Sequence, residues 1–83
     1  MVETESREPG ILRIAVDCPL RALLDYLPPA GLRATDLAPG IRVRVSLGRR
    51  SAIGIVVAHA ALSAVAHERL RAAEEPLDTE PLF

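Results

Sequence analysis

The sequence has one cysteine and no tryptophan, lysine, asparagine or glutamine. The single cysteine, Cys18, excludes an intramolecular disulfide and fits a reducing compartment. The only aromatic residues, Tyr26 and Phe83, offer little stacking surface for a long single strand of nucleic acid. No apolar run approaches the roughly 20 residues that cross a bilayer, and the acidic N-terminus lacks the apolar segment of a signal peptide. We therefore expect a cytoplasmic protein with no membrane partner.

The sequence patterns of common catalytic sites are also missing. The glycines form neither G-x-G-x-x-G nor a P-loop, and no serine lies in a G-x-S-x-G context. His59 and His67 are eight residues apart and far from Cys18, so the spacing of a zinc site is absent. Nothing in the sequence places Asp17 and Asp25 together as an acid–base pair. We expect neither a metal site nor catalysis from this chain.

Charge is distributed unevenly along the 83 residues, which make one domain at most. The formal net charge is −1, but residues 1–9 carry −2, residues 10–71 carry +5 and residues 72–83 carry −4. Residues 1–9 are expected to be a flexible acidic lead-in. The basic middle points to an anionic partner without identifying it.

Residues 41–58 carry the clearest structural pattern. Apolar and polar residues alternate over 41–47, which is typical of a half-buried strand. Residues 48–51 have the length of a hairpin loop, and residues 52–58 read as a strand that is apolar on both faces. Gly54 interrupts this strand and permits a bulge or the close approach of another backbone.

The patterns of the remaining segments are less distinctive. Residues 11–16 alternate and predict a first strand. Residues 20–27 are ambiguous, because their leucine spacing favours a short helix although prolines bracket the segment. Residues 32–37 have room for a short turn, and the alanine-rich residues 58–73 favour a helix by propensity.

Four arginines and no acid lie in residues 41–50, namely Arg42, Arg44, Arg49 and Arg50. These side chains have the chemistry to contact nucleic-acid phosphates. The alternative is that Arg42 and Arg44 only form the exposed face of a strand, where charge keeps the sheet soluble. The sequence leaves both interpretations open.

Four segments in order carry a likeness to a known family: ILRIAVDCPL (11–20), LLDYLPPAG (23–31), APGIRVRVSLGRRSAIGIVV (38–57) and RLRAAEEPLDTEPLF (69–83). They resemble a pattern of roughly V-P-L at the end of a strand, F-D-Y-x-x-P, G-x-R-V-x-V-P-F-G-x-R before x-G-x-V, and L-K-x-V-x-x-x-L-D-x-x-P. This is the pattern of the N-terminal 3′-DNA-binding domain of the primosomal protein N′ (PriA) family of replication-restart helicases.

The resemblance implies a mainly β fold with little helix (α+β), a small OB-like β-barrel or sheet domain over residues 10–83. It implies a module that recognises the 3′-hydroxyl end of the nascent leading strand at stalled replication forks and positions the helicase there. Its partners would be DNA with a free 3′ end, the rest of the helicase and other primosome proteins, near the nucleoid. The domain itself would be non-catalytic and without a cofactor. The ATP, magnesium and zinc of an ATP-dependent 3′–5′ DNA helicase would belong to parts absent from this chain.

By position, the resemblance implies a pocket for the terminal nucleotide formed by Leu24, Asp25, Tyr26, Gly48 and Arg71. Asp25 would accept a hydrogen bond from a sugar hydroxyl or base edge and would repel a terminal phosphate. Gly48 would let the backbone lie close to the nucleotide, and Arg71 would donate to a phosphate or sugar oxygen. For Tyr26 a buried structural role and a stacking role both stay open, and for Asp25 the alternative is a carboxylate that only caps a loop.

The sequence departs from the family pattern at several of these positions. Leu24 stands where the family usually has phenylalanine, which removes a stacking surface worth about 1–3 kcal/mol. Ser46 and Leu47 replace a common Pro-Phe pair, and Arg71 replaces a lysine. We therefore expect weaker nucleotide binding than is typical of the family.

The resemblance also changes two local predictions. It implies that residues 24–27 are extended and that part of residues 69–77 pairs as a strand, because tertiary pairing often outweighs propensity in short segments. The alternative function is a structural or protein-docking β-barrel with no nucleic-acid pocket, whose arginines meet an acidic partner or only water.

Overall fold

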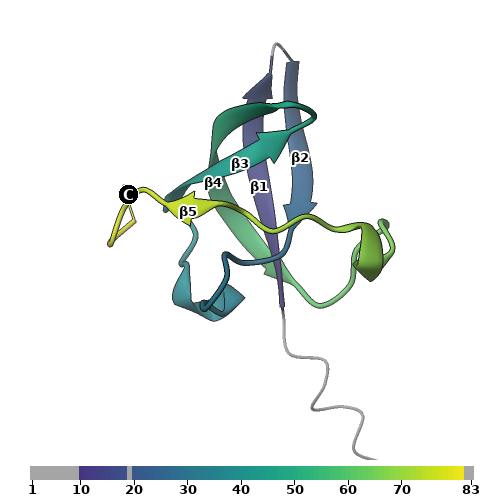
Figure 1. Ribbon diagram of the computed structural model, residues 1–83. Helices are drawn as coiled ribbons and strands as arrows, with labels where there is room; N and C mark the ends of the chain where they lie inside the picture. The colour runs from purple at the N-terminus through teal and green to yellow at the C-terminus, as the bar shows by residue number, and fades with distance from the viewer. Residues whose placement is uncertain (1–9, 19, 82–83) are drawn as a thin grey trace, which may run out of the picture.

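The described residues form one five-stranded β-sheet with almost no helix (Figure 1). The computed structural model describes residues 10–18 and 20–81, so the predicted lead-in over residues 1–9 lies outside the described residues. The elements in chain order are strand β1 (Ile11–Cys18), strand β2 (Leu20–Tyr26), 3-10 turn η2 (Ala34–Asp36), strand β3 (Arg42–Leu47), strand β4 (Arg50–Ala60), 3-10 turn η3 (His67–Arg69) and strand β5 (Glu75–Pro76). The mainly β fold class is confirmed.

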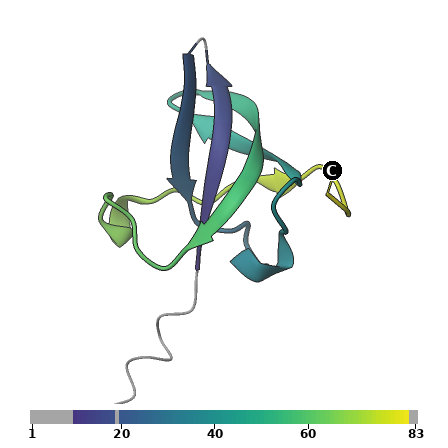
Figure 2. The same cartoon turned by 180° about the vertical axis from the view of Figure 1, so that it is seen from behind.

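Every pair of neighbouring strands in the sheet is antiparallel, in the order β2-β1-β4-β3-β5 (Figure 2). The C-terminal segment joins the two ends of this order. Ala72 forms a parallel bridge with Leu27, just after β2, and the chain then continues into β5 beside β3. Backbone bonds of 2.8 Å from Leu27 N to the Arg71 carbonyl and from Ala73 N to the Leu27 carbonyl fix this closure. The sheet therefore curls into a small OB-like barrel.

The β3–β4 hairpin is confirmed, but its predicted loop over residues 48–51 is shorter, because Arg50 and Ser51 already pair with β3 as the start of β4. Both glycines of the hairpin have a physical role. Leu47 pairs with Arg50, so the turn is Gly48-Arg49, with φ of +64° at Gly48. Glycine at the first central position is typical of a type II′ hairpin turn, whose twist suits the flanking strands. Gly54 permits close approach to β1, since a Cβ there would lie 2.9 Å from the Ala15 carbonyl oxygen.

The core lies on the inner face of the curled sheet. Its fully buried side chains come from alternate positions of β1 and β3 together with β4: Leu12, Ile14, Val16, Val43, Val45 and Val56. Burying one such side chain contributes about 1.5–3 kcal/mol. The alternation read from residues 11–16 and 41–47 therefore predicted the correct faces.

Propensity gave the wrong structure for two segments. Residues 20–26 are strand β2 rather than a helix, because every one of them pairs with a residue of β1. Residues 58–73 do not form the predicted helix, because β4 continues to Ala60, opposite Ile11 of β1, and between Ala60 and residue 73 only η3 is helical. The strand pairing implied for residues 69–77 is confirmed by the Ala72 bridge and β5, and the short turn predicted within residues 32–37 is η2.

Within residues 10–18 and 20–81, no helical segment has the length and apolar character required to span a membrane.

Candidate nucleic-acid interface

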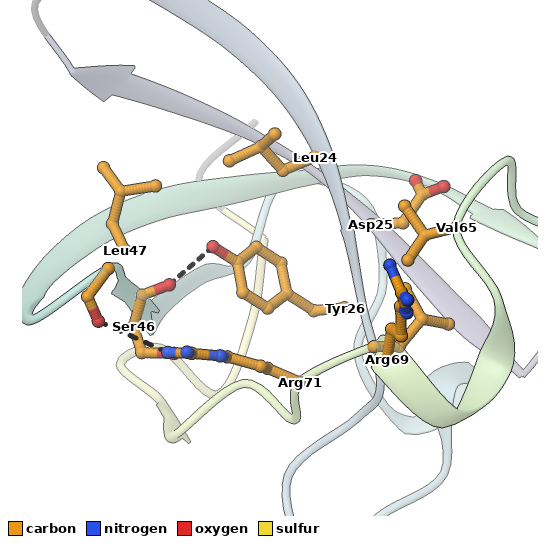
Figure 3. A pocket seen from close by; sticks show the side chains of 10 residues that line it. Leu24, Asp25, Tyr26, Ser46, Leu47, Val65, Arg69 and Arg71 are labelled. Atoms are coloured by element: carbon orange, nitrogen blue, oxygen red, sulfur yellow. Dashed lines mark hydrogen bonds between the residues drawn. The ribbon is translucent and has the colours of Figure 1, made fainter.

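A pocket of about 250 Å³ lies where the end of β2 meets the tip of the β3–β4 hairpin and the segment around η3 (Figure 3). All five positions implied by the resemblance line it: Leu24, Asp25, Tyr26, Gly48 and Arg71. They come from three distant parts of the chain, and only the closed barrel brings them together. The local sequence patterns give no sign of this convergence, and only the resemblance to the family implied it.

Five further residues complete the lining: Ser46, Leu47, Val65, Arg69 and Leu70. Ser46 and Leu47 precede the hairpin turn, whereas the other three lie in the segment for which propensity predicted a helix. That segment instead contributes a wall of the pocket, and of its lining residues the resemblance implied only Arg71. The sequence feature that could have pointed to this wall of the pocket is the pair of arginines Arg69 and Arg71, which lie two positions apart.

Two hydrogen bonds tie the walls of the pocket to the hairpin tip. The Tyr26 hydroxyl donates to the Ser46 carbonyl at 2.7 Å, which connects β2 to β3. Arg71 Nη1 donates to the Gly48 carbonyl at 3.3 Å, which connects the C-terminal segment to the same tip. The Tyr26 ring is part of the core cluster, and the residue is only 5% exposed. This burial favours the structural role for Tyr26, because a ring packed in the core has little face free for a base.

Asp25 is the carboxylate of the pocket, and β1 holds it. Its partner across the strands is Arg13, whose Nε lies 2.9 Å from Asp25 Oδ1 and whose Nη2 lies 3.5 Å from Oδ2. The Ser63 hydroxyl also donates to Oδ2. The side chain is 13% exposed. Asp25 is thus a strand residue in an ion pair rather than a loop cap.

The pKa of the Asp25 carboxyl lies below its ordinary value, chiefly because Arg13 donates hydrogen bonds to the ionised form. Partial burial opposes this shift, and the Ser63 hydrogen bond adds to it. Asp25 is therefore ionised at neutral pH and can only accept hydrogen bonds. A carboxylate has about four acceptor positions, so Arg13 and Ser63 leave capacity for a further donor.

Arg42 and Arg44 point outward from β3, and each has a carboxylate partner in the chain's own acidic C-terminal segment. Arg42 Nη2 lies 2.9 Å from Asp78 Oδ1, and Arg42 Nε lies 3.1 Å from Asp78 Oδ2. Arg44 pairs with Glu75 of β5. Arg42 lowers the pKa of the Asp78 carboxyl by hydrogen bonding to its ionised form. Much of the charge asymmetry of the sequence is therefore satisfied internally, which charge counting alone missed.

Arg49 and Arg50 lie at the hairpin tip, exposed and next to Gly48. No side chain of the described residues forms an ion pair with either of them. They remain available to an external anion, so their predicted contact with phosphate stays a prediction. For Arg42 and Arg44 the same contact would compete with an existing ion pair.

The described part of the chain contains no group of three His, Cys, Asp or Glu side chains that could hold a metal ion. His59 has a structural contact instead, because its Nε2 lies 2.7 Å from the Leu37 carbonyl oxygen.

A comparison with protein families matches residues 13–83 to the 3′DNA-binding domain (3′BD). The chain belongs to this family. A search of curated proteins finds the replication restart protein PriA of Haemophilus influenzae, which is 37% identical over 73 residues. The match covers 88% of the chain and 10% of that protein, so the chain spans about a tenth of this relative. Membership of the 3′BD family makes the chain a DNA-binding module and confirms the resemblance read from the four segments.

Proposed function

We propose that this 3′BD chain binds the 3′-terminal nucleotide of the nascent leading strand at a stalled fork and so positions a replication-restart helicase. One observation carries the proposal. The five positions expected to form the end-binding pocket, drawn from β2, the hairpin turn and the C-terminal segment, line a single cavity. A structural barrel without a ligand has no need of that convergence.

The chemistry of the pocket suits a strand that ends in a hydroxyl. Its volume of about 250 Å³ is below the range of about 300–1,000 Å³ typical of drug-sized ligands, and so suits no more than one nucleoside. Asp25 accepts a hydrogen bond from a hydroxyl, whereas a terminal phosphate would meet its negative charge. Gly48 adds no side chain at the rim, and a Cβ there would meet nothing within 4 Å. Leu24 supplies an apolar contact without a stacking face.

A replication-restart helicase has functions beyond those proposed for this chain. In this proposal the helicase activity, its ATP, magnesium and zinc, and its primosome partners belong to the parent protein. The role of this chain is to bind and orient a DNA end.

The proposal is tested by fluorescence anisotropy with one short oligonucleotide that ends in either a 3′-hydroxyl or a 3′-phosphate. We expect tighter binding of the hydroxyl end by about fivefold, which corresponds to about 1 kcal/mol. The bare repulsion of two charges at 4 Å is about 1 kcal/mol in water and larger near a protein surface. Arg13 offsets part of the charge of Asp25, so we expect a repulsion near the lower of these two values, about 1 kcal/mol.

Asp25→Asn removes the charge and keeps the shape, so it is expected to reduce the preference for the hydroxyl end. Asp78→Asn is a matched control. Both carboxylates are 13% exposed and lie 2.9 Å from an arginine nitrogen, but Asp78 is outside the pocket. The control should keep the preference of the wild type. Equal binding of both ends by the wild type would reject the pocket, and no DNA binding at low salt would favour a docking barrel.

A further inference from the structure

The arginines whose side chains the structure describes fall into two groups that the sequence does not distinguish. Three of them form ion pairs with carboxylates of the chain: Arg13 with Asp25, Arg42 with Asp78 and Arg44 with Glu75. These guanidinium groups already have an anionic partner, so an external phosphate would have to displace or share it. A phosphate-binding group is better sought among the others.

Arg69 is an unpaired arginine in the wall of the pocket. It is the last residue of η3, whose turn is closed by a bond of 2.8 Å from Arg69 N to the Ala66 carbonyl. The residue is exposed, and its guanidinium forms no ion pair or hydrogen bond with the described residues. Figure 3 shows its side chain on the side of Val65 and Asp25, whereas Arg71 extends toward Ser46. The two arginines therefore serve different sides of the pocket.

The neighbouring groups leave Arg69 free for a ligand. The one carboxylate that lines the pocket, Asp25, is held by Arg13 and Ser63. Arg71 already donates to the Gly48 carbonyl and so helps to form the wall. A strand whose last nucleoside occupies the pocket brings in the phosphodiester on the 5′ side of that nucleoside. A guanidinium offers this anion a planar pair of donors.

We propose that Arg69 binds the phosphodiester that joins the terminal nucleotide to its neighbour, and that Arg42 and Arg44 do not supply the phosphate contacts of this domain. The inference rests on the proposed function and adds a residue to it. Arg69 determines how firmly the strand is held, while Asp25 determines which end is accepted.

The test measures the affinity for a 5′-labelled oligonucleotide with a free 3′-hydroxyl over a range of salt concentrations. Arg69→Ala is expected to weaken binding about 5- to 20-fold at low salt. It should also reduce the salt slope by about 0.7, the value for one neutralised phosphate on a single strand. The preference for the hydroxyl end should persist. Arg69→Lys should recover the slope, because it keeps the charge.

Arg33→Ala is the matched control, since Arg33 is an exposed arginine beside a 3-10 turn, outside the pocket and without an ion pair among the described residues. It should bind within about twofold of the wild type, as should Arg44→Ala. If Arg69→Ala keeps the affinity and salt slope of a wild type that prefers the hydroxyl end, the inference is wrong and the pocket stands. A wild type with no end preference would reject both.

Discussion

Tyr26→Phe separates a structural from a ligand-binding role for the single tyrosine of the pocket. The substitution keeps the ring and removes the hydroxyl that donates to the Ser46 carbonyl at 2.7 Å. A protein hydrogen bond contributes about 0.5–1.5 kcal/mol net, and an unsatisfied buried acceptor costs about 1–3 kcal/mol. Ser46 is half-buried, so water reaches part of this site, and we expect a loss of about 1 kcal/mol in the free energy of unfolding.

Urea unfolding followed by circular dichroism measures this loss. A chain of this size loses about 1 kcal/mol of stability per molar urea, so the midpoint should fall by about 1 M. Thermal unfolding should show a decrease of about 4–8 °C in Tm. Ser51→Ala is the control, because it removes an exposed hydroxyl whose contacts to Glu74 are as long as 3.4 Å, and its midpoint should not change.

The DNA affinity of Tyr26→Phe is then compared with that of the wild type. We expect Tyr26→Phe to bind the 3′-hydroxyl oligonucleotide within about twofold of the wild type, once both proteins are folded. An unchanged midpoint combined with weaker DNA binding would refute the reasoning, because the hydroxyl would then contact the nucleotide rather than connect β2 to β3.

Two further predictions concern the fold. Gly54→Ala would place a Cβ 2.4 Å from Ile14 Cγ2 and 2.9 Å from the Ala15 carbonyl oxygen, so we expect a loss of about 1–3 kcal/mol in urea unfolding; wild-type stability would show that β1 and β4 are not so close. Because Arg42 lowers the pKa of Asp78, that carboxylate stabilises the folded state above about pH 4 and stops doing so as the pH falls through the lowered pKa. Midpoints measured from pH 7 to pH 2 should therefore fall less for Asp78→Asn than for the wild type, and parallel curves would contradict the ion pair.

The sequence by itself determined the hairpin and its two faces. Alternation over residues 41–47 and the glycine of the turn are local signals, since side chains two apart share a face of a strand and positive φ suits glycine. The four ordered segments also determined the family, because they carry the constraints of the barrel without stating its geometry.

Only the tertiary structure decided the segments with weak local preference. Residues 20–26 have helical spacing, yet the backbone groups of β1 pair with them and outweigh that propensity. The segment after Ala60 supplies Val65, Arg69, Leu70 and Arg71 to the pocket, because the residues that follow it are held by Leu27 and by β3.

The charges were decided in the same way. Sequence counts gave a basic middle and an acidic end, but only the pairing of β3 with β5 shows that the acidic end lies on the arginines of β3. Arg42 and Arg44 are therefore already in ion pairs, whereas the Arg69 guanidinium at the pocket forms no ion pair with the described residues. Local sequence was enough to predict the strand conformation of residues 41–47. Which charge meets which depends on long-range contacts, and these exist only once the barrel closes.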